Sequence, residues 1–510
     1  MIAEFVDVGL VSTTIANAVK EVLGFELNSF EALLERSRRL DKEDFPRTQL
    51  SSALIDYNER IGADKFAVAN ARRLSENGAM AIVTGQQAGL FTGPAYSVYK
   101  AVTTIKLAKE MQKRTGKTVI PIYWNATDDH DLSEVAHCRF PEREWVADFG
   151  GNGRAVETFS IDSVTALMGD FQEVVRQDVM HFFDDRHKRY GEFSSSVISK
   201  LFAGTGLVVL EPKLLRPLAT DFFKRSVVAN EALCAKLTHD AERLERLKIN
   251  VSFSIDEGTG IFAMGKNGLR RRIRKSGASF EVMENVYTKG ELVELIESAP
   301  DTISTGAWLR PILQNHLIPT LAYVAGPGEI EYHLQLGGAF GVMQQTMAPL
   351  WMRNHVTVLG QKENRIMKGL GWGAADLFRP IQDLRPSNDL PPDLDELFVA
   401  GLRSLTDIGT KLKRELSDYS CERTIDGFVS KASKEFDKIR KRVLRDRRMK
   451  LGIDNGRIDR LSKALRPNER PQERWINVFY FISNYGRTFI DELIQTLEPT
   501  QTKHYVIRPN

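Results

Sequence analysis

Residues 83–100 read VTGQQAGLFTGPAYSVYK, a glycine-rich stretch that follows a short apolar run from Met80 to Val83. Glycines stand at positions 85, 89 and 93, where they allow the backbone to turn sharply and to approach a ligand closely. Pro94 suits the first position of a helix, so that Thr92 or Gly93 would cap a helix over residues 94–113. The stretch therefore predicts a strand, a tight turn and a helix.

A helix N-terminus behind a glycine-rich turn offers free N–H groups and the positive end of the helix dipole, a combination that favours an anion and usually a phosphate. The stretch is not a Walker A loop, because no Gly-Lys-Ser/Thr follows, and its four-residue glycine spacing is not the dinucleotide fingerprint. The alternative is a tight connection whose glycines serve packing alone. The candidate binding residues here are Gly85, Gln86, Gln87, Gly89, Thr92, Gly93, Pro94, Tyr96 and Lys100.

Further apolar runs predict a parallel sheet. Thr118–Trp124 reads as a buried strand entered after Gly116, a good helix stop, so residues 80–124 form a strand–helix–strand unit with parallel strands. Strands that alternate with helices are typical of an α/β fold. Later runs of the same kind cover Gly206–Leu210, Leu321–Ala325 and Ala348–Met352.

An antiparallel insertion is predicted at about residues 250–300. Between Val251 and Val286, the short runs VSFSID, GIFAM, LRRRIR and SFEVM are separated by glycine-containing turns. A helix over Lys289–Ser298 follows, with Thr288 as its cap. We interpret the basic run LRRRIRK, residues 269–275, as the solvent-facing side of a strand.

The C-terminal part of the chain has a different pattern. Prolines at 380, 386, 391 and 392 predict a linker over residues 380–393. Apolar residues then recur at three- and four-residue steps, so residues 394–510 are predicted to form a helical domain of long antiparallel helices or a short coiled coil. The basic segment Lys431–Lys450 is interpreted as a solvated face or a subunit contact, in preference to the alternative of a nucleic-acid contact. Residues 1–379, mostly helical up to residue 79, form the predicted core.

Composition places the chain among soluble globular proteins. Its 510 residues suffice for two to four domains, and a formal charge of +3 gives no reason to expect a nucleic-acid partner. Cys138, Cys234 and Cys421 are too few for a disulfide framework or a thiolate metal site. The N-terminus lacks a basic leader, and no apolar run approaches a membrane span. We expect a cytoplasmic protein without a membrane anchor.

A polar cluster follows the second predicted strand, where Asp128, Asp129 and Asp131 surround His130. Because ligands of open parallel sheets bind at the carboxyl ends of strands, this cluster and the Gly93 turn should face one crevice. The carboxylates could bind Mg²⁺ or a substrate ammonium, and His130 could act as an acid or base. Zinc is not favoured, since no third nitrogen or sulfur ligand accompanies His130 and His137. The alternative is a capped loop, in which Asp128 or Asp131 caps a helix.

A second glycine turn follows a later strand, at Gly326-Pro-Gly328-Glu329. Glu329 would lie at a helix start, where it could cap the helix or hold a substrate amine or a metal. Arg310 and Arg353 lie before and after this turn in the sequence and could supply positive charge for an acidic substrate.

Four of these segments resemble one protein family. The motifs GQQAGLFTGPAYSVYK, DDHDLSEVAH, WLRPILQN and LAYVAGPGEIEYHLQL are similar, in this order, to the bacillithiol-biosynthesis cysteine-adding enzymes called BshC. The resemblance implies a Rossmann-like core related to class I aminoacyl-tRNA synthetases and nucleotidyltransferases, with inserted connecting segments. It also implies a C-terminal coiled coil through which a homodimer forms.

The resemblance further implies a ligase that joins the carboxyl of cysteine to the amine of glucosaminyl-malate, with ATP as the activating cosubstrate. His130 would then take a proton from the amine, with Asp129 and Asp131 beside it, while Arg310, Arg353 or Lys100 would meet the malate carboxylates. A HIGH-like sequence is absent, and no KMSKS-like loop is seen. Two alternatives stay open: a nucleotidyltransferase with another acceptor, and a non-catalytic coiled-coil scaffold.

Overall fold

The computed structural model describes residues 1–151, 153–183, 186–253, 258–384 and 390–509. The chain divides into two units. The core unit comprises Met1–Gly360 and Arg470–Asn510, and the helical unit comprises Gln361–Glu469. The sequence pattern assigned all of residues 394–510 to the C-terminal domain, whereas the structure folds residues 470 onward with the core.

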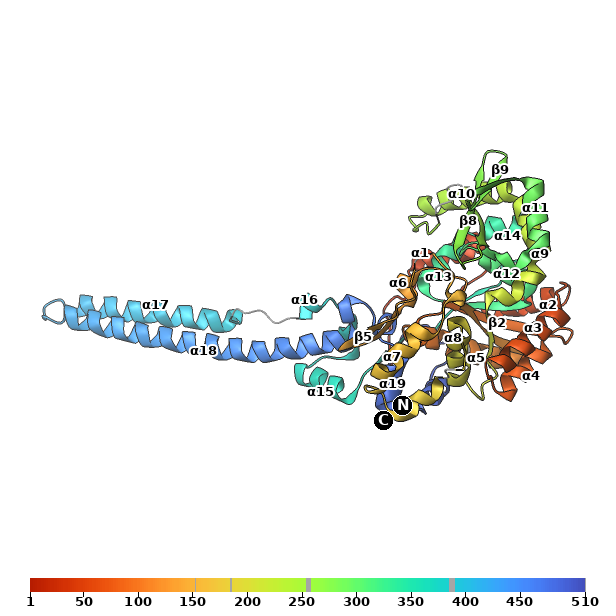
Figure 1. Ribbon diagram of the computed structural model, residues 1–510. Coiled ribbons are helices and arrows are strands. Elements are labelled where there is room, and N and C mark those ends of the chain that lie inside the picture. The colour runs from red at the N-terminus through yellow and green to blue at the C-terminus, as the bar shows by residue number, and fades with distance from the viewer. Residues whose placement is uncertain (152, 184–185, 254–257, 385–389, 510) are drawn as a thin grey trace. The chain divides into compact units, whose positions relative to one another are not determined.

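A five-stranded parallel sheet forms the centre of the core unit (Figure 1). Its spatial order is β13-β12-β2-β3-β6, and every neighbouring pair is parallel. By position along the chain this order is 5-4-1-2-3, which is the arrangement of a Rossmann-type sheet. The predicted Rossmann-like α/β class is confirmed. The strands are β2 (Met80–Gln87), β3 (Val119–Ala126), β6 (Val208–Leu210), β12 (Thr320–Ala325) and β13 (Leu350–Met352).

The sheet is buried on both faces, as the continuous apolar runs of its strands require. Alternate residues of β2 point to opposite sides, so Met80 and Ile82 join a cluster with α2 and α5, while Ala81 and Val83 join the larger cluster on the other face. Trp124 of β3 lies in that second cluster and is completely buried. The elements that supply these clusters include α2 (Phe30–Leu40), α3 (Arg47–Arg60), α5 (Tyr96–Thr115), α9 (Thr220–Val228) and α12 (Arg310–Leu317).

The turn between β2 and α5 is closed by contact between two glycines. Gly93 has a φ of +65°, and its Cα packs against Gly89. The helix begins at Tyr96, two residues later than predicted, and neither Thr92 nor Gly93 caps it. The reason is tertiary: the Ala95 N–H donates to the carbonyl of Ile476 at 2.8 Å, which ties this segment to the C-terminal part of the core.

The predicted antiparallel insertion is present as a five-stranded sheet in the order β10-β9-β8-β7-β11. Thr288 caps the following helix in a capping box with Glu291, as its sequence position indicates. Residues 254–256 of the predicted first strand lie outside the described residues, and residues 251–253 form no strand. The bounds are β7 (Gly258–Met264), β8 (Arg270–Ser276), β9 (Ser279–Val282), β10 (Asn285–Thr288), β11 (Ile303–Thr305) and α11 (Lys289–Ser298).

Two further sheets have no counterpart in the sequence-based expectations. One joins both ends of the chain, because β15 (His504–Arg508) pairs antiparallel with β1 (Ile2–Val6) and parallel with β14 (Val356–Val358). The other is the hairpin of β4 (His137–Phe140) and β5 (Arg143–Val146). The β1–β15 pairing joins residues about five hundred positions apart. Such a pairing leaves no local pattern, which explains why the first of these sheets was not predicted.

The remaining helices of the core unit connect and cover these sheets. None of the helices in the described ranges is long and apolar enough to cross a membrane. The helices not yet named are α1 (Thr13–Ala18), α4 (Lys65–Arg73), α6 (Leu132–Val135), α7 (Asp162–Gln172), α8 (Tyr190–Leu201), α10 (Asn230–Arg246), α13 (Pro327–Leu334), α14 (Gly337–Val342), α19 (Val478–Tyr485) and α20 (Phe489–Thr496).

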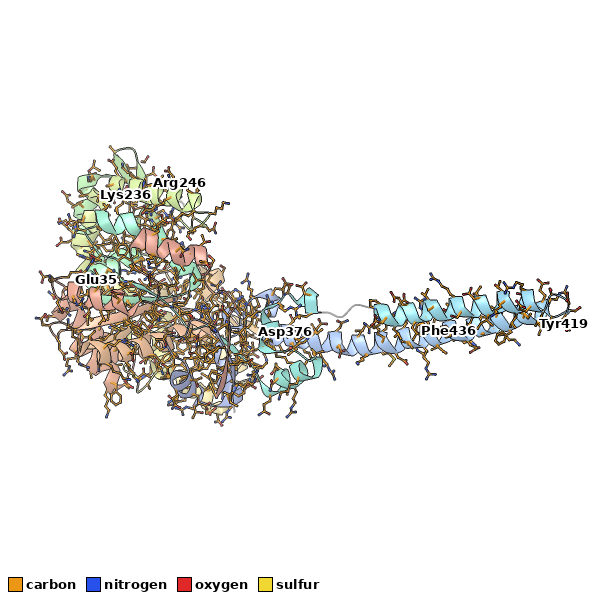
Figure 2. All side chains as sticks on the ribbon, turned by 180° about the vertical axis from the view of Figure 1, so that it is seen from behind. Glu35, Lys236, Arg246, Asp376, Tyr419 and Phe436 are labelled. Carbon is orange, nitrogen blue, oxygen red and sulfur yellow. The ribbon has the colours of Figure 1, made fainter. Side chains whose placement is uncertain are left out.

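The helical unit is dominated by two long antiparallel helices, α17 (Pro392–Glu415) and α18 (Glu422–Leu465), which lie side by side (Figures 1 and 2). Phe398 and Phe436 pack with ring centroids 5.5 Å apart, and Asp395 pairs with Arg440 at 2.6 Å. Shorter helices precede them, and Pro386 of the predicted linker lies outside the described residues. These shorter helices are α15 (Gln361–Leu370) and α16 (Ile381–Leu384).

The contact between the two turn glycines predicts a measurable loss of stability. A Cβ added to Gly89 would lie 2.7 Å from the Cα of Gly93, a clash with backbone that cannot move aside easily, so Gly89→Ala should lower the free energy of unfolding by about 2 kcal/mol. The control is Gly290→Ala in α11, where nothing lies within 4 Å and the change should shift stability by less than about 1 kcal/mol. Urea unfolding of both variants measures this. Equal stability of Gly89→Ala and wild type would contradict the packing role.

Candidate functional site

The strand order locates the site. Neighbouring strands β2 and β12 are followed by connections that leave in opposite directions along the sheet, toward β3 and toward β13. Ligands of Rossmann-type proteins bind at such a switch point, outside the carboxyl ends of the strands. Here these ends carry residues 85–87 and residues 326–329, the two glycine-containing segments that the sequence analysis singled out.

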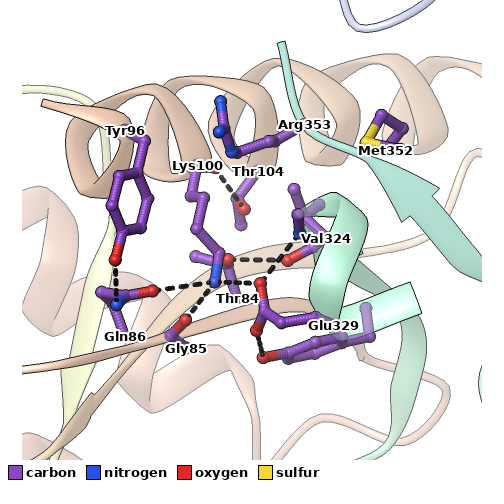
Figure 3. A network of polar contacts seen from close by, with 12 residues as sticks. Thr84, Gly85, Gln86, Tyr96, Lys100, Thr104, Val324, Glu329, Met352 and Arg353 are labelled. Carbon is purple, nitrogen blue, oxygen red and sulfur yellow. Dashed lines mark hydrogen bonds and ion pairs between the residues drawn. The ribbon is translucent and has the colours of Figure 1, made fainter. Parts of the chain in front are cut away.

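A buried ion pair joins the two strand ends (Figure 3). Lys100, on the second turn of α5, is fully buried, and its Nζ lies 2.6 Å from Oε2 of Glu329. The same ammonium donates to the carbonyl of Gly85 and, at 3.3 Å, to Oε1 of Gln86. Burial lowers the pKa of Lys100, and the Glu329 carboxylate opposes this shift. The Lys100 ammonium is therefore paired inside the protein, and Lys100 is not an exposed anion-binding lysine.

Glu329 is held by further donors. Its carboxylate accepts from the backbone N–H of Gly326 at 2.8 Å and from the hydroxyl of Tyr323 at 2.7 Å. Burial alone would raise the pKa of Glu329, but the Lys100 ammonium together with the hydrogen bonds from Gly326 and Tyr323 outweighs it and keeps the pKa below its ordinary value. The side chain is 22% exposed. Glu329 thus caps α13 and presents a fixed, charged carboxylate at the switch point.

Arg310 and Arg353, the two arginines predicted to meet substrate, differ in how their guanidinium groups are paired within the protein. Arg310 donates to the hydroxyls of Tyr323 and Tyr332 at 3.2 and 3.0 Å and remains only partly buried. Arg353 is buried and forms a two-pronged pair with Glu473, at 2.7 and 3.0 Å. The charge of Arg353 is therefore balanced inside the protein, because Glu473 belongs to the C-terminal segment that folds back on the core.

The His130 loop lies at the same edge of the sheet. The ends of β2 and β3 are in register, with Gln87 opposite Ala126, and Nε2 of Gln87 donates to Oδ2 of Asp129 at 2.7 Å. Asp129 also accepts from the backbone N–H of His130. Asp131 caps α6 through the N–H of Ser133 at 2.9 Å, which is the capping role that the sequence left open.

Arg270 contacts His130 and was missed as a site residue. It begins the basic run of β8, of which Arg271, Arg272 and Arg274 are exposed as expected, but Arg270 itself is buried. Its Nη1 lies 3.0 Å from Nδ1 of His130. Burial and the Arg270 charge both lower the pKa of His130. Since a guanidinium can only donate, Nδ1 accepts and the neutral imidazole carries its proton on Nε2.

A group of buried charges lies behind this loop, and we call Asp128, Glu157, Arg216 and Arg270 the Asp128 cluster. Nη1 of Arg216 lies 2.8 Å from Oε1 of Glu157, and Nη2 of Arg270 lies 3.9 Å from Oδ2 of Asp128. Burial raises the pKa of both Asp128 and Glu157, while the arginines oppose the shift. No sequence motif indicated Glu157 or Arg216, because they come from separate short 3₁₀ segments.

A buried hydrogen-bond network around Glu211 anchors the loop that carries Asp128. The Thr127 hydroxyl donates to Oε2 of Glu211 at 2.7 Å, and Tyr57 donates to the other oxygen of the same carboxylate. Thr127, Tyr57 and Glu211 are all completely buried. This network fixes the backbone immediately before Asp128.

Other predicted residues lie elsewhere or serve packing. Asn477 donates from its side-chain amide to the carbonyls of Phe91 and Gly93, so the turn that includes Gly89, Thr92, Gly93 and Pro94 is tied to the C-terminal segment. Gly328 is exposed on α13. Tyr96 receives a hydrogen bond from Gln86 at 2.7 Å. His137 pairs with Glu144 on the β4–β5 hairpin, away from His130.

Across the residues that the structure describes, no three His, Cys, Asp or Glu side chains are grouped to hold a metal.

The buried ion pair predicts a large stability difference between two lysines of the same helix. Lys100→Met should lower the free energy of unfolding by roughly 3 kcal/mol, because it leaves the Glu329 carboxylate without its counter-ion. Lys106 of α5 forms a surface pair with Glu498 at 2.9 Å, so Lys106→Met should cost less than about 1 kcal/mol. Denaturant unfolding of the two variants measures the contrast, and equal losses would contradict it.

The same pair predicts a pH dependence. The folded-state pKa of Glu329 lies below its unfolded value, so its contribution is fully present above the unfolded pKa and is lost as pH falls through the folded pKa. The stability gap between wild type and Lys100→Met should therefore narrow on acidification below about pH 4. A gap that stayed constant with pH would show that Lys100 stabilises by packing alone, and one that widened would contradict the ion-pair argument.

Comparison with known proteins agrees with this architecture. The family model for the N-terminal Rossmann-like domain of bacillithiol biosynthesis BshC matches residues 13–354, and the model for the C-terminal coiled-coil domain of BshC matches residues 356–509. The two domain models meet near residue 355, close to the boundary at Gly360 between the two units.

Curated relatives extend over most of the chain. A protein of Heliobacterium modesticaldum is 30% identical, with 94% of this chain and 93% of the relative covered. Proteins of Geobacillus sp. and Salinibacter ruber are 29% and 27% identical, with 90% and 91% of this chain and 90% and 89% of the relatives covered. Each carries the name "Putative cysteine ligase BshC". With its Rossmann-type sheet, its helical hairpin and matches to both domain models, the chain belongs to the BshC family.

Proposed function

We propose that this chain is a cysteine ligase that forms an amide bond between the carboxyl of cysteine and the amine of glucosaminyl-malate, with ATP activating the carboxyl. The observation that carries the proposal is the fixed Glu329 carboxylate at the switch point of a Rossmann-type sheet, in a chain that matches both BshC domain models. Membership of the family supports the reaction, and the switch point supports the place where it occurs.

The residues at this edge suit a charged nucleotide and an amine. ATP supplies the activation of the carboxyl. Among the described residues, three of the five N–H groups of Arg310 donate to Gln314, Tyr323 and Tyr332, and the other two are available to a phosphate or a malate carboxylate. Glu329 supplies a negative charge for the incoming amine, and Lys100 acts as a positioning residue that keeps Glu329 charged and in place.

His130 has a more specific role than the sequence indicated. With Nδ1 occupied by Arg270, the neutral ring presents an N–H at Nε2, and the side chain is 37% exposed. A fixed N–H donor stabilises negative charge that develops on a transferring group. We therefore assign His130 as a hydrogen-bond donor to the activated carboxyl or its leaving group, in place of the general base that the sequence alone suggested.

The function is tested by reconstitution. Purified full-length protein is incubated with cysteine, glucosaminyl-malate, ATP and Mg²⁺, and bacillithiol is quantified together with AMP and ADP. We expect bacillithiol to form only when all three organic substrates are present, with AMP or ADP identifying the type of activation. Omission of Mg²⁺ tests whether the reaction requires this metal. ATP cleavage with pyrophosphate exchange in the absence of glucosaminyl-malate, and no bacillithiol, would instead indicate a nucleotidyltransferase with another acceptor.

The role of His130 is tested in the same assay. His130→Ala should lower kcat by about 10²- to 10³-fold, since it removes one preorganised donor. The matched control is His137→Ala seven residues away, whose side chain pairs with Glu144 and should be dispensable for turnover. Unchanged turnover of His130→Ala would remove this residue from the mechanism.

We also propose that the protein is a cytoplasmic homodimer that associates through α17 and α18. Several large apolar side chains of this hairpin are half or more exposed, a pattern that favours a protein partner. On α17 these are Leu397 and Ile408, and on α18 they are Phe428 and Ile439.

Light scattering after gel filtration measures the association state. The wild type should be a dimer, and the double variant Leu397→Glu with Phe428→Glu should be a monomer, because buried charges oppose association. Ser404→Glu, on an exposed position of the same helix, is the control and should remain dimeric. A wild-type monomer at micromolar concentration would overturn the proposal.

A further inference from the structure

The Asp128 cluster contains charged side chains that are buried but incompletely paired. Asp128 follows β3, Glu157 lies on the 3₁₀ turn Val156–Thr158, and Arg216 lies on the 3₁₀ segment Pro212–Ala219. Their side chains are only 9%, 6% and 7% exposed. The backbone N–H of Glu157 donates to the carbonyl of Thr127 at 2.7 Å, which joins these segments directly before Asp128.

Several polar atoms of this cluster carry no hydrogen bond within the described part of the chain. They are Nε and Nη2 of Arg216 and Oε2 of Glu157. Nη1 of Arg216 contacts Glu157 and, at 3.2 Å, the carbonyl of Asp301. The Asp128 carboxylate lies 3.9 Å from Nη2 of Arg270, beyond hydrogen-bond range of that arginine. Buried polar atoms are nearly always paired in folded proteins, so such a concentration requires an explanation.

The unpaired atoms have both signs, and this restricts the ligand. A simple anion would satisfy the Arg216 donors but leave Oε2 of Glu157 without a donor, and it would add negative charge beside the Asp128 carboxylate. A simple amine would satisfy the carboxylates but leave the arginine donors unpaired. A molecule with an ammonium and a carboxylate on one carbon satisfies both sets at once, since an ammonium has three donors and a carboxylate accepts from a guanidinium at two oxygens.

We propose that Asp128, Glu157 and Arg216 form a subsite for the zwitterionic head group of an α-amino acid, with the ammonium on Asp128 and Glu157 and the carboxylate on Arg216. The inference rests on the proposed function, and the amino acid is then cysteine. Asp129 and His130, the next two residues, are 28% and 37% exposed, so the chain reaches solvent directly after the buried Asp128.

Equilibrium binding to the full-length protein tests the subsite without requiring turnover. Calorimetry compares L-cysteine with cysteamine, which lacks the carboxylate, and with 3-mercaptopropionate, which lacks the ammonium. Arg216→Gln should weaken L-cysteine and 3-mercaptopropionate by about ten- to a hundredfold and leave cysteamine unchanged. Asp128→Asn should weaken L-cysteine and cysteamine and leave 3-mercaptopropionate unchanged.

A matched control separates binding from general destabilisation. Arg36→Gln removes another buried arginine, which pairs with Glu43 far from the cluster, and should leave the affinity for L-cysteine unchanged. Should Arg216→Gln fail to fold, Asp128→Asn, which preserves side-chain size, still decides the question through its contrast between cysteamine and 3-mercaptopropionate.

The outcomes distinguish this inference from the proposed function. Wild-type affinity for L-cysteine in both Arg216→Gln and Asp128→Asn, in a protein that makes bacillithiol, overturns the subsite and leaves the ligase intact. Selective losses as predicted, in a protein that binds L-cysteine but makes no bacillithiol, support the subsite and overturn the reaction.

Discussion

The ion pair between Lys100 and Glu329 is the interaction on which the candidate site depends. It connects α5, which follows the first strand of the sheet, to the end of the fourth strand, and it also fixes the carbonyl of Gly85. Taking an ammonium out of water is costly, so such a pair persists only when the geometry supplies further hydrogen bonds. Here Tyr323 and the backbone of Gly326 supply them to the carboxylate. The two strand ends are thereby held in one arrangement before any ligand binds.

The antiparallel insertion takes part in the site. Arg270 at the start of β8 reaches the His130 loop, and its contact with Nδ1 determines which ring nitrogen faces outward with a proton. Arg270 is itself held by Ser304 and the carbonyl of Thr305 on β11. The insertion therefore orients a polar loop of the parallel sheet, which gives a physical reason for its presence between two strands of the core.

The C-terminal segment has a comparable structural role. Residues 470–510 follow the helical unit in the sequence but fold with the core unit. Glu473 neutralises the buried Arg353, and Asn477 binds the carbonyls of the glycine turn. The burial of Glu473 would raise its pKa, yet Arg353 and His355 keep that pKa well below its ordinary value. Arg353, which the sequence analysis assigns to substrate binding, thus attaches the segment after residue 470 to the end of the parallel sheet.

Local patterns in the sequence determined the parallel strands, the antiparallel insertion, the long C-terminal helices and the cap at Thr288, because each depends on residues within a few positions of one another. They also indicated Lys100, His130 and Glu329, which lie at the same edge of one sheet. Only the tertiary structure decided the partners of these residues: Lys100 with Glu329, His130 with Arg270, and the cluster around Asp128. The physical reason is that a buried charge takes its partner from whatever segment folding brings beside it, and sequence separations of 140 or 229 residues leave no periodic signal.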